Sequence, residues 1–447
     1  MHAVRARLTA LLLLFPSLAA AQGVPDLVVS DADFPPRNLP REALGRLLFF
    51  DKILSGDRNI ACATCHNPQA ALGDGLSLPL GTGAVGFGTG RRPDGPERGV
   101  TMRIPRNAPA LFNLGAREFS VLFADGRVAA DPAQPGRFLT PAGERLPPGL
   151  DGVLAAQALF TLVTHEEMAG QPGANPVADA VAADRLEDAW ELLAQRLRAI
   201  PEYVELFRAA FPELAGPQDM HIVHAANALA AFQAAALRCT DSPFDRAVRG
   251  DRALASPAAE AGAELFYGKA GCSHCHSGPF QTDHRFHAIG VPQIGPGKGD
   301  NQPGYFDGLD DFGRERETFD PIDRFRFRTP SLRQIALTGP WGHAGAYADL
   351  KSMVRHHLNP AAALERYDPA QARLPPRADL DAQDFTVMRD PERRRGLAAR
   401  LDIVPLELSE EELDRLVAFL HALTDPACID LRGLQPMTVP SGLAVGD

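Results

Sequence analysis

Two Cys-x-x-Cys-His pentads carry the clearest chemical signal in this 447-residue sequence. Two thiols at this spacing lie on one helical turn, so both can form thioethers to the vinyl groups of a single haem. The histidine that follows each pair can then turn its imidazole onto the iron. The sequence therefore predicts two covalently bound c-type haems, held by Cys62, Cys65, His66, Cys272, Cys275 and His276.

A single pentad could also be a chance match, half of a zinc site or a redox dithiol. A zinc site needs a second Cys or His pair nearby, and a thioredoxin-like dithiol needs a βαβ context. Neither pattern surrounds either pentad. Because the two pentads support each other, a di-haem c-type cytochrome is the preferred interpretation.

The first 21 residues have the pattern of a signal peptide. Arg5 and Arg7 make a basic start, Leu8–Phe15 is an apolar run too short to span a bilayer, and Ala19–Ala21 is a small-residue cleavage signal. A retained membrane anchor is the less favoured alternative. We expect residues 1–21 to be removed and the mature protein to be a soluble periplasmic protein without a membrane span.

Composition limits the classes of protein and partner. A hydrophobic fraction of 45% is that of a globular core, and a net charge of -11 argues against nucleic acid or an anionic membrane as a partner. Four of the six cysteines belong to the pentads, which leaves Cys239 and Cys428. In an oxidising compartment these two could form a disulfide, or they could be two buried thiols.

The hydrophobic spacing predicts an all-α fold with long loops. The last helix should begin at a capping box formed by Ser409 and Glu412. Loops rich in Gly and Pro are expected at residues 81–99, 131–149 and 295–323. The other expected helices are Glu42–Asp51, Val153–Val163, Ala178–Ala199, Tyr203–Phe211, His221–Leu237 and Ala258–Tyr267.

Each half of the chain has a pentad after a helix that ends in aromatic residues, Leu47–Phe50 in one half and Leu265–Tyr267 in the other. This similarity indicates a diverged internal repeat with a boundary near Gly250. We expect two cytochrome c-like domains, each carrying one haem, at residues 22–249 and 250–430, followed by a tail at residues 431–447.

The chain also resembles the bacterial di-haem cytochrome c peroxidase family, which includes the di-haem enzyme that matures tryptophan tryptophylquinone. The resemblance extends from about Leu39 to Thr424. It is carried by both pentads and by Leu47-Phe49-Phe50-Asp51, Pro105-Arg106-Asn107, Asp125-Gly126-Arg127, Pro201-Glu202-Tyr203-Val204 and Arg328-Thr329-Pro330-Ser331-Leu332.

The resemblance implies that the two haems have different tasks. The haem on His66 would cleave peroxide, and the haem on His276 would pass or store electrons. Gln157 and the pair Glu167-Met168 match family residues above the peroxide pocket, which implies that Glu167 is the acid–base group. Chemically, a carboxyl near an open iron can move a proton between the two peroxide oxygens. The neighbours His165 and Glu166 could also serve.

The sequence departs from the standard peroxidases after the first pentad. Many relatives close the peroxide site with a histidine, and the matching position here is Thr82. No histidine occurs between Leu76 and Gly99. We therefore predict an N-terminal haem that is open without reductive activation, as in the quinone-maturing relative.

A second departure concerns the distal ligand of the C-terminal haem. This ligand is methionine in standard peroxidases and tyrosine in the quinone-maturing enzyme, and the matching position here is His357. Helical spacing places His357 on one apolar face with Leu350, Met353 and Val354. Met353 is the main rival, and His356 points elsewhere. A bis-histidine haem would have a lower potential than a His/Met haem.

A third departure is Ala124, where the family has a tryptophan that relays electrons between the haems. Trp341 could replace it, or could be an ordinary core residue. The resemblance also implies a calcium ion between the haems, bound by Asn107 and by the carbonyls of Thr338 and Pro340. Oxygen ligands suit this hard cation. The acidic loop at residues 307–311 is expected to be solvated.

Three functions remain in consideration. The first is a peroxidase that reduces hydrogen peroxide with electrons from a small periplasmic cytochrome c or cupredoxin. The second is a quinone-maturation-like enzyme that oxidises an aromatic residue on a partner protein. The third is a non-enzymatic electron carrier, which would need no acid–base group. Homodimers are common among such relatives, so a second copy of the chain is also an expected partner.

Overall fold

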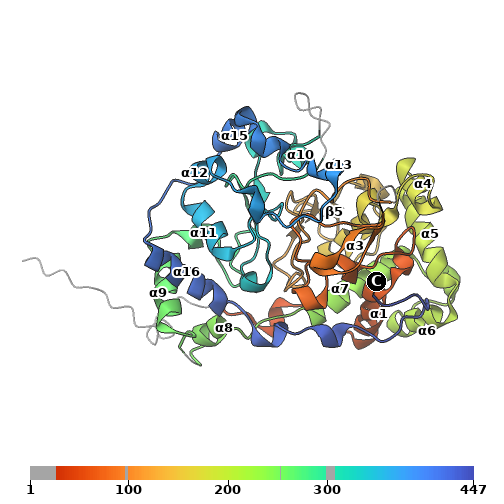
Figure 1. The fold of residues 1–447 in the computed structure, drawn as a ribbon. Coiled ribbons are helices and arrows are strands. Elements are labelled where there is room, and N and C mark those ends of the chain that lie inside the picture. The colour runs from red at the N-terminus through yellow and green to blue at the C-terminus, as the bar shows by residue number, and fades with distance from the viewer. Residues whose placement is uncertain (1–26, 96–98, 252, 299–307, 447) are drawn as a thin grey trace, which may run out of the picture.

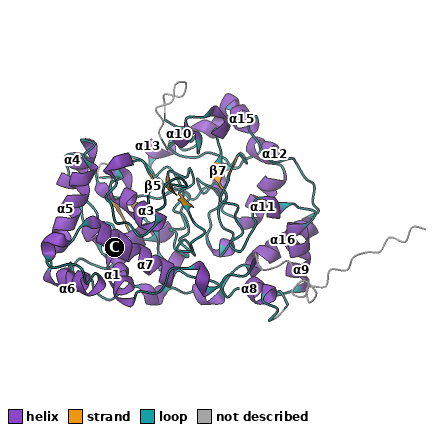
Figure 2. Cartoon of the chain, turned by 180° about the vertical axis from the view of Figure 1, so that it is seen from behind, coloured by secondary structure: helices purple, strands orange, loops and turns teal. Residues whose placement is uncertain are grey.

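The computed structural model describes residues 27–95, 99–251, 253–298 and 308–446. The predicted signal peptide therefore lies outside the described residues. Helices surround a centre of long loops and short strands (Figures 1 and 2). In the described part of the chain, no helix has the length and hydropathy needed to cross a bilayer.

The helices fall into two groups along the chain, with α1 to α8 before the predicted boundary region and α9 to α16 after it. The first group is α1 Leu39–Phe50, α2 Cys62–Cys65, α3 Val153–Leu162, α4 Pro176–Ala182, α5 Leu186–Arg198, α6 Pro201–Ala210, α7 Ile222–Ala236 and α8 Pro243–Val248. The second group is α9 Pro257–Tyr267, α10 Glu315–Thr318, α11 Leu350–Leu358, α12 Pro360–Glu365, α13 Ala378–Asp381, α14 Thr386–Arg389, α15 Pro391–Ala398 and α16 Glu410–Ala422.

The fold is mostly helical but not purely so, because short antiparallel strands pair within the loops. These pairings were missed because strands of two or three residues show no alternating pattern. β1 Ala84–Val85 pairs with β2 Arg92–Pro93, and β6 Phe286–His287 pairs with β7 Phe327–Arg328. A three-stranded sheet is formed by β3 Val121–Leu122, β4 Val128–Ala130 and β5 Phe138–Leu139.

Most predicted helices occur within a few residues of their expected bounds. The prediction of one helix over Ala178–Ala199 is wrong, because the chain forms α4 and α5 with a break between them. At the break, Asp184 has a φ of 53°, a left-handed conformation that interrupts a right-handed helix. The capping box before α16 is confirmed, since Ser409 and Glu412 bond to each other's backbone N–H.

Two helix crossings repeat in the two halves of the molecule. α1 crosses α7 at Gly45, where a Cβ would lie 1.9 Å from the carbonyl oxygen of Ala228. α9 crosses α16 at Gly262, where a Cβ would lie 1.9 Å from the carbonyl oxygen of Arg415. Only glycine permits backbones to come this close. In both halves the pentad follows the first helix of the crossing pair.

The end of the chain returns from α16 to the N-terminal half, as Figure 1 shows where the C-terminus lies near α1. Val439 is buried in the same hydrophobic core as α1 and α7. The Ser441 hydroxyl donates a 2.6 Å hydrogen bond to the buried carboxylate of Asp51. Arg46 and Lys52 donate to carbonyl oxygens of Leu434 and Gly446. The tail is therefore part of the N-terminal core.

A disulfide joins Cys239, which follows α7, to Cys428, which follows α16. Both residues belong to the N-terminal core. Of the two alternatives that the sequence left open, the structure therefore contains the bond, which fixes the start of the returning tail.

Replacing Cys239 and Cys428 with serine should lower the free energy of unfolding by about 2–5 kcal/mol, because the unfolded chain loses a long-range constraint. Denaturant unfolding of the oxidised holoprotein would measure this. Dithiothreitol should destabilise the wild type but not the double variant. Equal stability of oxidised wild type and double variant would contradict the expectation.

Candidate functional site

The first four residues of the first pentad form α2, and His66 follows directly with its ring held in a fixed orientation. The Thr64 hydroxyl caps the turn by accepting the Ala61 N–H at 3.0 Å. His66 Nδ1 donates to the carbonyl oxygen of Leu72 at 3.0 Å. This bond fixes the imidazole tautomer and leaves Nε2 available for a metal, the arrangement typical of a ligating histidine.

The second pentad faces a histidine from α11. His276 Nδ1 donates to the Gln281 carbonyl at 3.1 Å, and His357 Nδ1 donates to the Met353 carbonyl at 2.9 Å. The two ring centres are 6.4 Å apart. Two imidazoles that share a metal at about 2 Å from each nitrogen have ring centres about 6 Å apart. The donors and their spacing therefore fit a haem iron between His276 and His357.

The pentad thiols lie in surroundings that favour the protonated form. Burial raises the pKa of Cys62 and Cys65 to about 12 and that of Cys272 to about 11, whereas redox dithiols have lowered values. Cys275 lies near Asp283 and His287 in a group that could hold a metal. Those two already bond to each other at 2.8 Å, and a structural zinc would need a fourth ligand.

Met353 and His356, the other two α11 residues considered as ligands, lie in surroundings that differ from those of His357. Met353 lies in a small apolar cluster with Val291 and Tyr347. His356 is buried and bonds on both sides, to the Tyr347 hydroxyl at 2.8 Å and to the Ile289 carbonyl at 2.7 Å. Both nitrogens of His356 are thus engaged within the protein, which leaves neither for a metal.

Glu167 lies in a short π-helical turn, residues His165–Ala169, that follows α3. Burial raises the pKa of Glu167, against the opposing effect of Lys298 and Arg127. Glu167 is also among the charges that raise the pKa of the Cys65 thiol in the first pentad. A carboxylate with a raised pKa is a better proton acceptor than an ordinary glutamate.

The other proposed pocket residues differ from Glu167 in their surroundings. Gln157 is partly buried on α3, before the turn that carries Glu167. His165 Nδ1 donates to the Gly170 carbonyl at 2.7 Å, which closes the turn. Glu166 and Glu167 are both partly buried. His165 thus has a structural task, and Glu167 is the carboxyl of the group whose pKa is raised by burial.

Thr82 is held against the same turn. Its N–H donates to the Glu167 carbonyl at 3.1 Å. Its hydroxyl donates to Asp57 at 3.0 Å and accepts from Asn59 at 3.0 Å. Arg91 fixes this loop by donating to the carbonyl oxygens of Gly81 and Gly86, both at 2.8 Å. The Thr82 hydroxyl is therefore occupied by protein partners.

A cluster of buried ion pairs joins the two halves of the chain. Arg106 contacts Asp125 at 2.6 Å and Asp311 at 2.7 Å, and Arg127 also pairs with Asp125. The expectation of a solvated acidic loop is wrong for its described residues, because Asp310 and Asp311 are buried and ion-paired. The cause is pairing with arginines distant in sequence, which neutralises the buried charge.

Ala124 and Trp341 lie in different surroundings. The Ala124 carbonyl accepts the N–H of Arg328 at 2.8 Å, which ties the Asp125 motif to β7. The Trp341 indole N–H donates to the Ile335 carbonyl at 2.9 Å, and its ring packs with Met353 and Tyr347. Trp341 thus lies in the apolar cluster of the C-terminal half.

A small cavity of about 10 Å³ brings together two of the three predicted calcium ligands, Asn107 and Thr338. Gly339 lines it, whereas Pro340 does not. The Asn107 amide nitrogen donates to the Leu76 carbonyl at 2.7 Å, so its oxygen is available to a cation. The cavity can hold one water or ion.

Asp74 also lines this cavity and was not predicted as a ligand. One carboxylate oxygen accepts the Leu76 N–H at 3.0 Å, and the other is buried without a hydrogen-bond partner. Burial raises the pKa of Asp74 to about 7. A bound cation would compensate this isolated carboxylate, and oxygen donors fit calcium.

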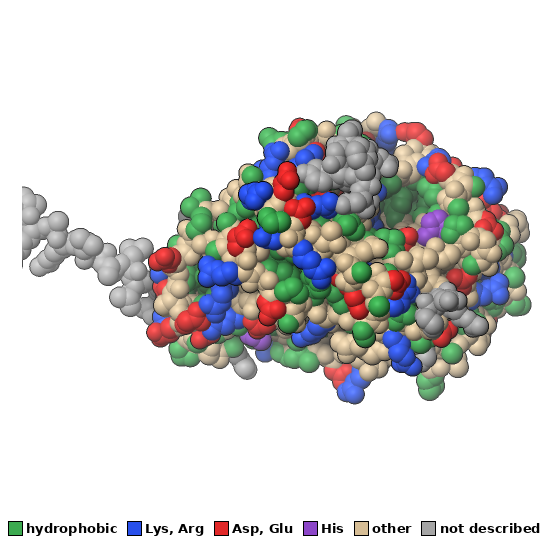
Figure 3. All heavy atoms as spheres, turned by 45° about the horizontal axis from the view of Figure 1, so that its top comes forward, with side chains coloured by type: hydrophobic (Ala, Val, Ile, Leu, Met, Phe, Trp, Pro, Cys, Tyr) green, Lys and Arg blue, Asp and Glu red, His purple; other side chains and the backbone are tan. Residues whose placement is uncertain are grey.

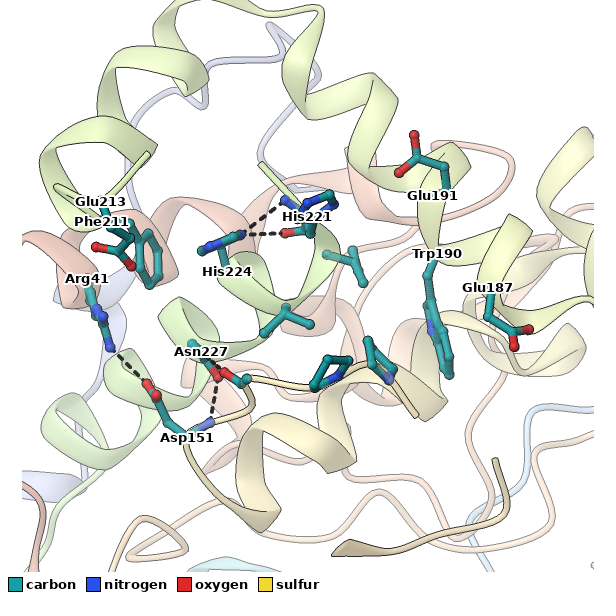
Figure 4. Close-up of a pocket in the computed structure, with 15 residues that line it drawn as sticks. Arg41, Asp151, Glu187, Trp190, Glu191, Phe211, Glu213, His221, His224 and Asn227 are labelled. Carbon is teal, nitrogen blue, oxygen red and sulfur yellow. Dashed lines mark hydrogen bonds and ion pairs between the residues drawn. The ribbon is translucent and has the colours of Figure 1, made fainter. Parts of the chain in front are cut away.

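A larger cavity, about 570 Å³, lies elsewhere and contains none of the predicted site residues. Figure 4 shows Arg41 paired with Asp151 on one side, Trp190 with two glutamates on the other, and His221 and His224 between them. No sequence motif pointed to this cavity, and its charged groups are of both signs.

Comparisons with known proteins identify the family of this chain. The family described as di-haem cytochrome c peroxidase matches residues 40–253. Methylamine utilization protein MauG of Methylorubrum extorquens is 30% identical over 393 residues, covering 87% of this chain and 80% of that protein. Cytochrome-c peroxidase IdrP1 of Denitromonas iodatirespirans is 30% identical over 435 residues, covering 93% and 89%.

A solved structure of similar fold is a MauG-like protein associated with microbial copper homeostasis. It shares 26% identity and has a TM-score of 0.57, covering 92% of this chain and 97% of that one. The sequence and structure therefore define an oxidoreductase of the c-type, two-haem class. The chain belongs to the di-haem cytochrome c peroxidase family, which includes the MauG proteins.

Proposed function

We propose that this protein is a periplasmic peroxidase that reduces hydrogen peroxide at an open N-terminal haem on His66. A second haem, between His276 and His357, relays or stores the oxidising equivalents. The observation that carries this proposal is Glu167, a carboxyl whose pKa is raised by burial and whose charge influences Cys65 of the first pentad. An electron carrier needs no such group, which argues against the third function.

Glu167 would act as the proton carrier of the pocket. When bound, the haem would supply the redox-active iron at which the oxygen–oxygen bond of peroxide breaks. The Glu167 carboxylate would accept the proton of the inner peroxide oxygen and donate it to the outer oxygen, which then leaves as water. Gln157 would orient peroxide from α3. The positive charges of Lys298 and Arg127 favour the ionised form of Glu167, which burial disfavours.

The open peroxide site is supported by the surroundings of Thr82. Its side chain bonds to Asp57 and Asn59, and Arg91 bonds to the backbone of the same loop, so the Thr82 hydroxyl is occupied by protein partners. No histidine is available in this segment to close the iron. The enzyme would thus react with peroxide in its fully oxidised form.

The calcium site would use Asn107, the backbone around Thr338, and Asp74. The unpartnered Asp74 oxygen supports a cation, and the cavity size suits one ion. Thr338–Pro340 and Asn107 come from the two halves, so calcium would join them. Of the two carbonyls expected from the resemblance, that of Pro340 is the less supported, because Gly339 lines the cavity in its place.

Oxidation of an aromatic residue on a partner protein remains the second candidate function. Two observations favour it: a MauG protein is 30% identical, and a histidine at position 357 would give the second haem a low potential that suits storage of oxidising equivalents.

Basic and acidic side chains are interspersed on the face shown in Figure 3, so no single-sign patch there selects the donor. A homodimer remains a proposal for solution measurement.

The oxidised holoprotein should give one high-spin and one bis-histidine low-spin signal in low-temperature EPR. His357→Ala should abolish the low-spin signal, because the iron loses an axial nitrogen, whereas Met353→Leu should preserve it. A signal that responds to Met353→Leu would exclude His357 as the ligand. Two low-spin signals in the wild type would contradict the open peroxide site.

Glu167→Gln should slow peroxide reduction with a small reduced donor by about 10²–10⁴-fold, because glutamine cannot carry the proton. Both haem spectra should stay nearly unchanged. In the wild type, the rate should fall as pH drops through the raised pKa of Glu167, since the accepting form is the carboxylate. Glu166→Gln is the matched control.

Two kinetic outcomes would count against this assignment. An unchanged rate in Glu167→Gln would remove Glu167 from the mechanism. Negligible wild-type turnover together with a long-lived oxidised state would favour the protein-oxidising function.

Asp74→Asn should weaken calcium binding measured by titration calorimetry. With a chelator present, the same variant should be more stable than the wild type at pH 8, because it removes an isolated buried charge. The raised pKa of about 7 means that the wild type regains stability as pH falls below 7 and folded Asp74 takes up a proton, so the difference should shrink progressively and vanish only below about pH 4, where the unfolded chain is protonated as well. Asp94→Asn, outside the cavity, serves as control, and unchanged calcium affinity in Asp74→Asn would contradict the site.

A further inference from the structure

Tyr347 and His356 form a buried pair next to the C-terminal haem site. The Tyr347 hydroxyl lies 2.8 Å from His356 Nδ1, and His356 Nε2 lies 2.7 Å from the Ile289 carbonyl oxygen. A carbonyl oxygen only accepts, so Nε2 carries the imidazole hydrogen and Nδ1 is a bare acceptor. The Tyr347 O–H therefore donates to Nδ1, and both ends of the imidazole are fixed.

The pair is close to the residue that faces His276. His356 and His357 are consecutive on α11, with ring centres 6.2 Å apart. The Tyr347 ring is 5.3 Å from the His356 ring, and it packs with Trp341 and Met353 in the apolar cluster of this half. The phenol is thus separated from the proposed iron ligand by a single side chain.

Tyr347 is isolated from water, because only 4% of its surface is exposed. A buried phenol that loses an electron becomes a strong acid and needs a base already in place. Among the described tyrosines, Tyr203 bonds to a carboxylate in the other half, and Tyr367 bonds to the Ala346 carbonyl, which cannot take a proton. Tyr347 is the described tyrosine whose hydroxyl bonds to an imidazole.

We propose that Tyr347 and His356 are a proton-coupled redox relay for the C-terminal haem. Tyr347 loses one electron to the C-terminal haem once peroxide has oxidised that haem beyond its resting ferric state, and its phenolic proton moves to His356 Nδ1 along the existing hydrogen bond. The products are a neutral tyrosyl radical and an imidazolium, and the haem is reduced by one electron. Re-reduction of the radical returns the proton to the phenolate oxygen.

The resting pair is suited to such a reversible step. His356 carries its one hydrogen on Nε2, toward the Ile289 carbonyl, and receives the Tyr347 hydroxyl at Nδ1, so both groups are neutral before oxidation. The same hydrogen bond gives the proton a path back when the radical is reduced. Tyr367 lies edge-on to Tyr347 with ring centres 5.8 Å apart and is partly exposed, so it extends the path toward the surface.

This inference rests on the proposed peroxidase function for its natural oxidant, so the test uses two oxidants. The diferric holoprotein is treated with hydrogen peroxide, or separately with photogenerated tris-bipyridine ruthenium(III), which needs no peroxide pocket. Samples are freeze-quenched for EPR, with ring-deuterated tyrosine to identify a tyrosyl radical. The variants are Tyr347→Phe and His356→Gln, and Tyr367→Phe is the matched control.

We expect a tyrosyl signal in the wild type and in Tyr367→Phe that is lost in Tyr347→Phe and in His356→Gln, with the haem optical spectra unchanged. Radical formation should slow in deuterated water, which a purely structural hydrogen bond would not cause. A Tyr347-dependent signal with ruthenium but not with peroxide would support the relay and overturn the peroxidase. A signal that survives Tyr347→Phe, or none with either oxidant, would overturn the relay.

Discussion

The architecture depends on two close helix crossings, α1 with α7 at Gly45 and α9 with α16 at Gly262. At both glycines, backbone atoms occupy the place of a side chain, so the angle and depth of the crossing are fixed by contact and not by flexible packing. Each pentad leaves the first helix of such a pair, and its cysteines and histidine therefore start from a rigid base. A phenylalanine of the partner helix, Phe232 or Phe419, covers the glycine in each case.

Between the two crossings, buried charges set the chemistry of the junction. Arg106 spans from Asp125 to Asp311, and its two ion pairs hold the N-terminal loop and the C-terminal loop at one place. The positive charges of Lys298 and Arg127 lower the pKa of Glu167 and so oppose the rise that burial causes. The proposed proton-transfer group is thus influenced by residues from both halves, which would couple its proton affinity to the assembly of the whole molecule.

The sequence was informative wherever a local rule applies. Pentad spacing predicted the haem-binding residues, the family resemblance predicted His357, which the structure places opposite His276, and the capping box located the start of α16. It was uninformative where the partner is distant. Asp310 and Asp311 looked like a solvated loop because their arginines lie far away in the chain. Asp74 and the Tyr347–His356 pair were missed for the same reason, since no spacing rule links residues that meet only in three dimensions. The Gly45 and Gly262 crossings could have been found by aligning the two halves.

The returning tail has a consequence for how the protein is made. Val439 and Ser441 complete a core whose other members come from the first half of the chain, and Asp51 receives its serine partner only from the end of the chain. During synthesis, the N-terminal half must therefore wait with an unfinished core until the last residues emerge. Cys62 and Cys65 pack against the same core, so the surroundings of the first pentad are complete only when the tail has docked.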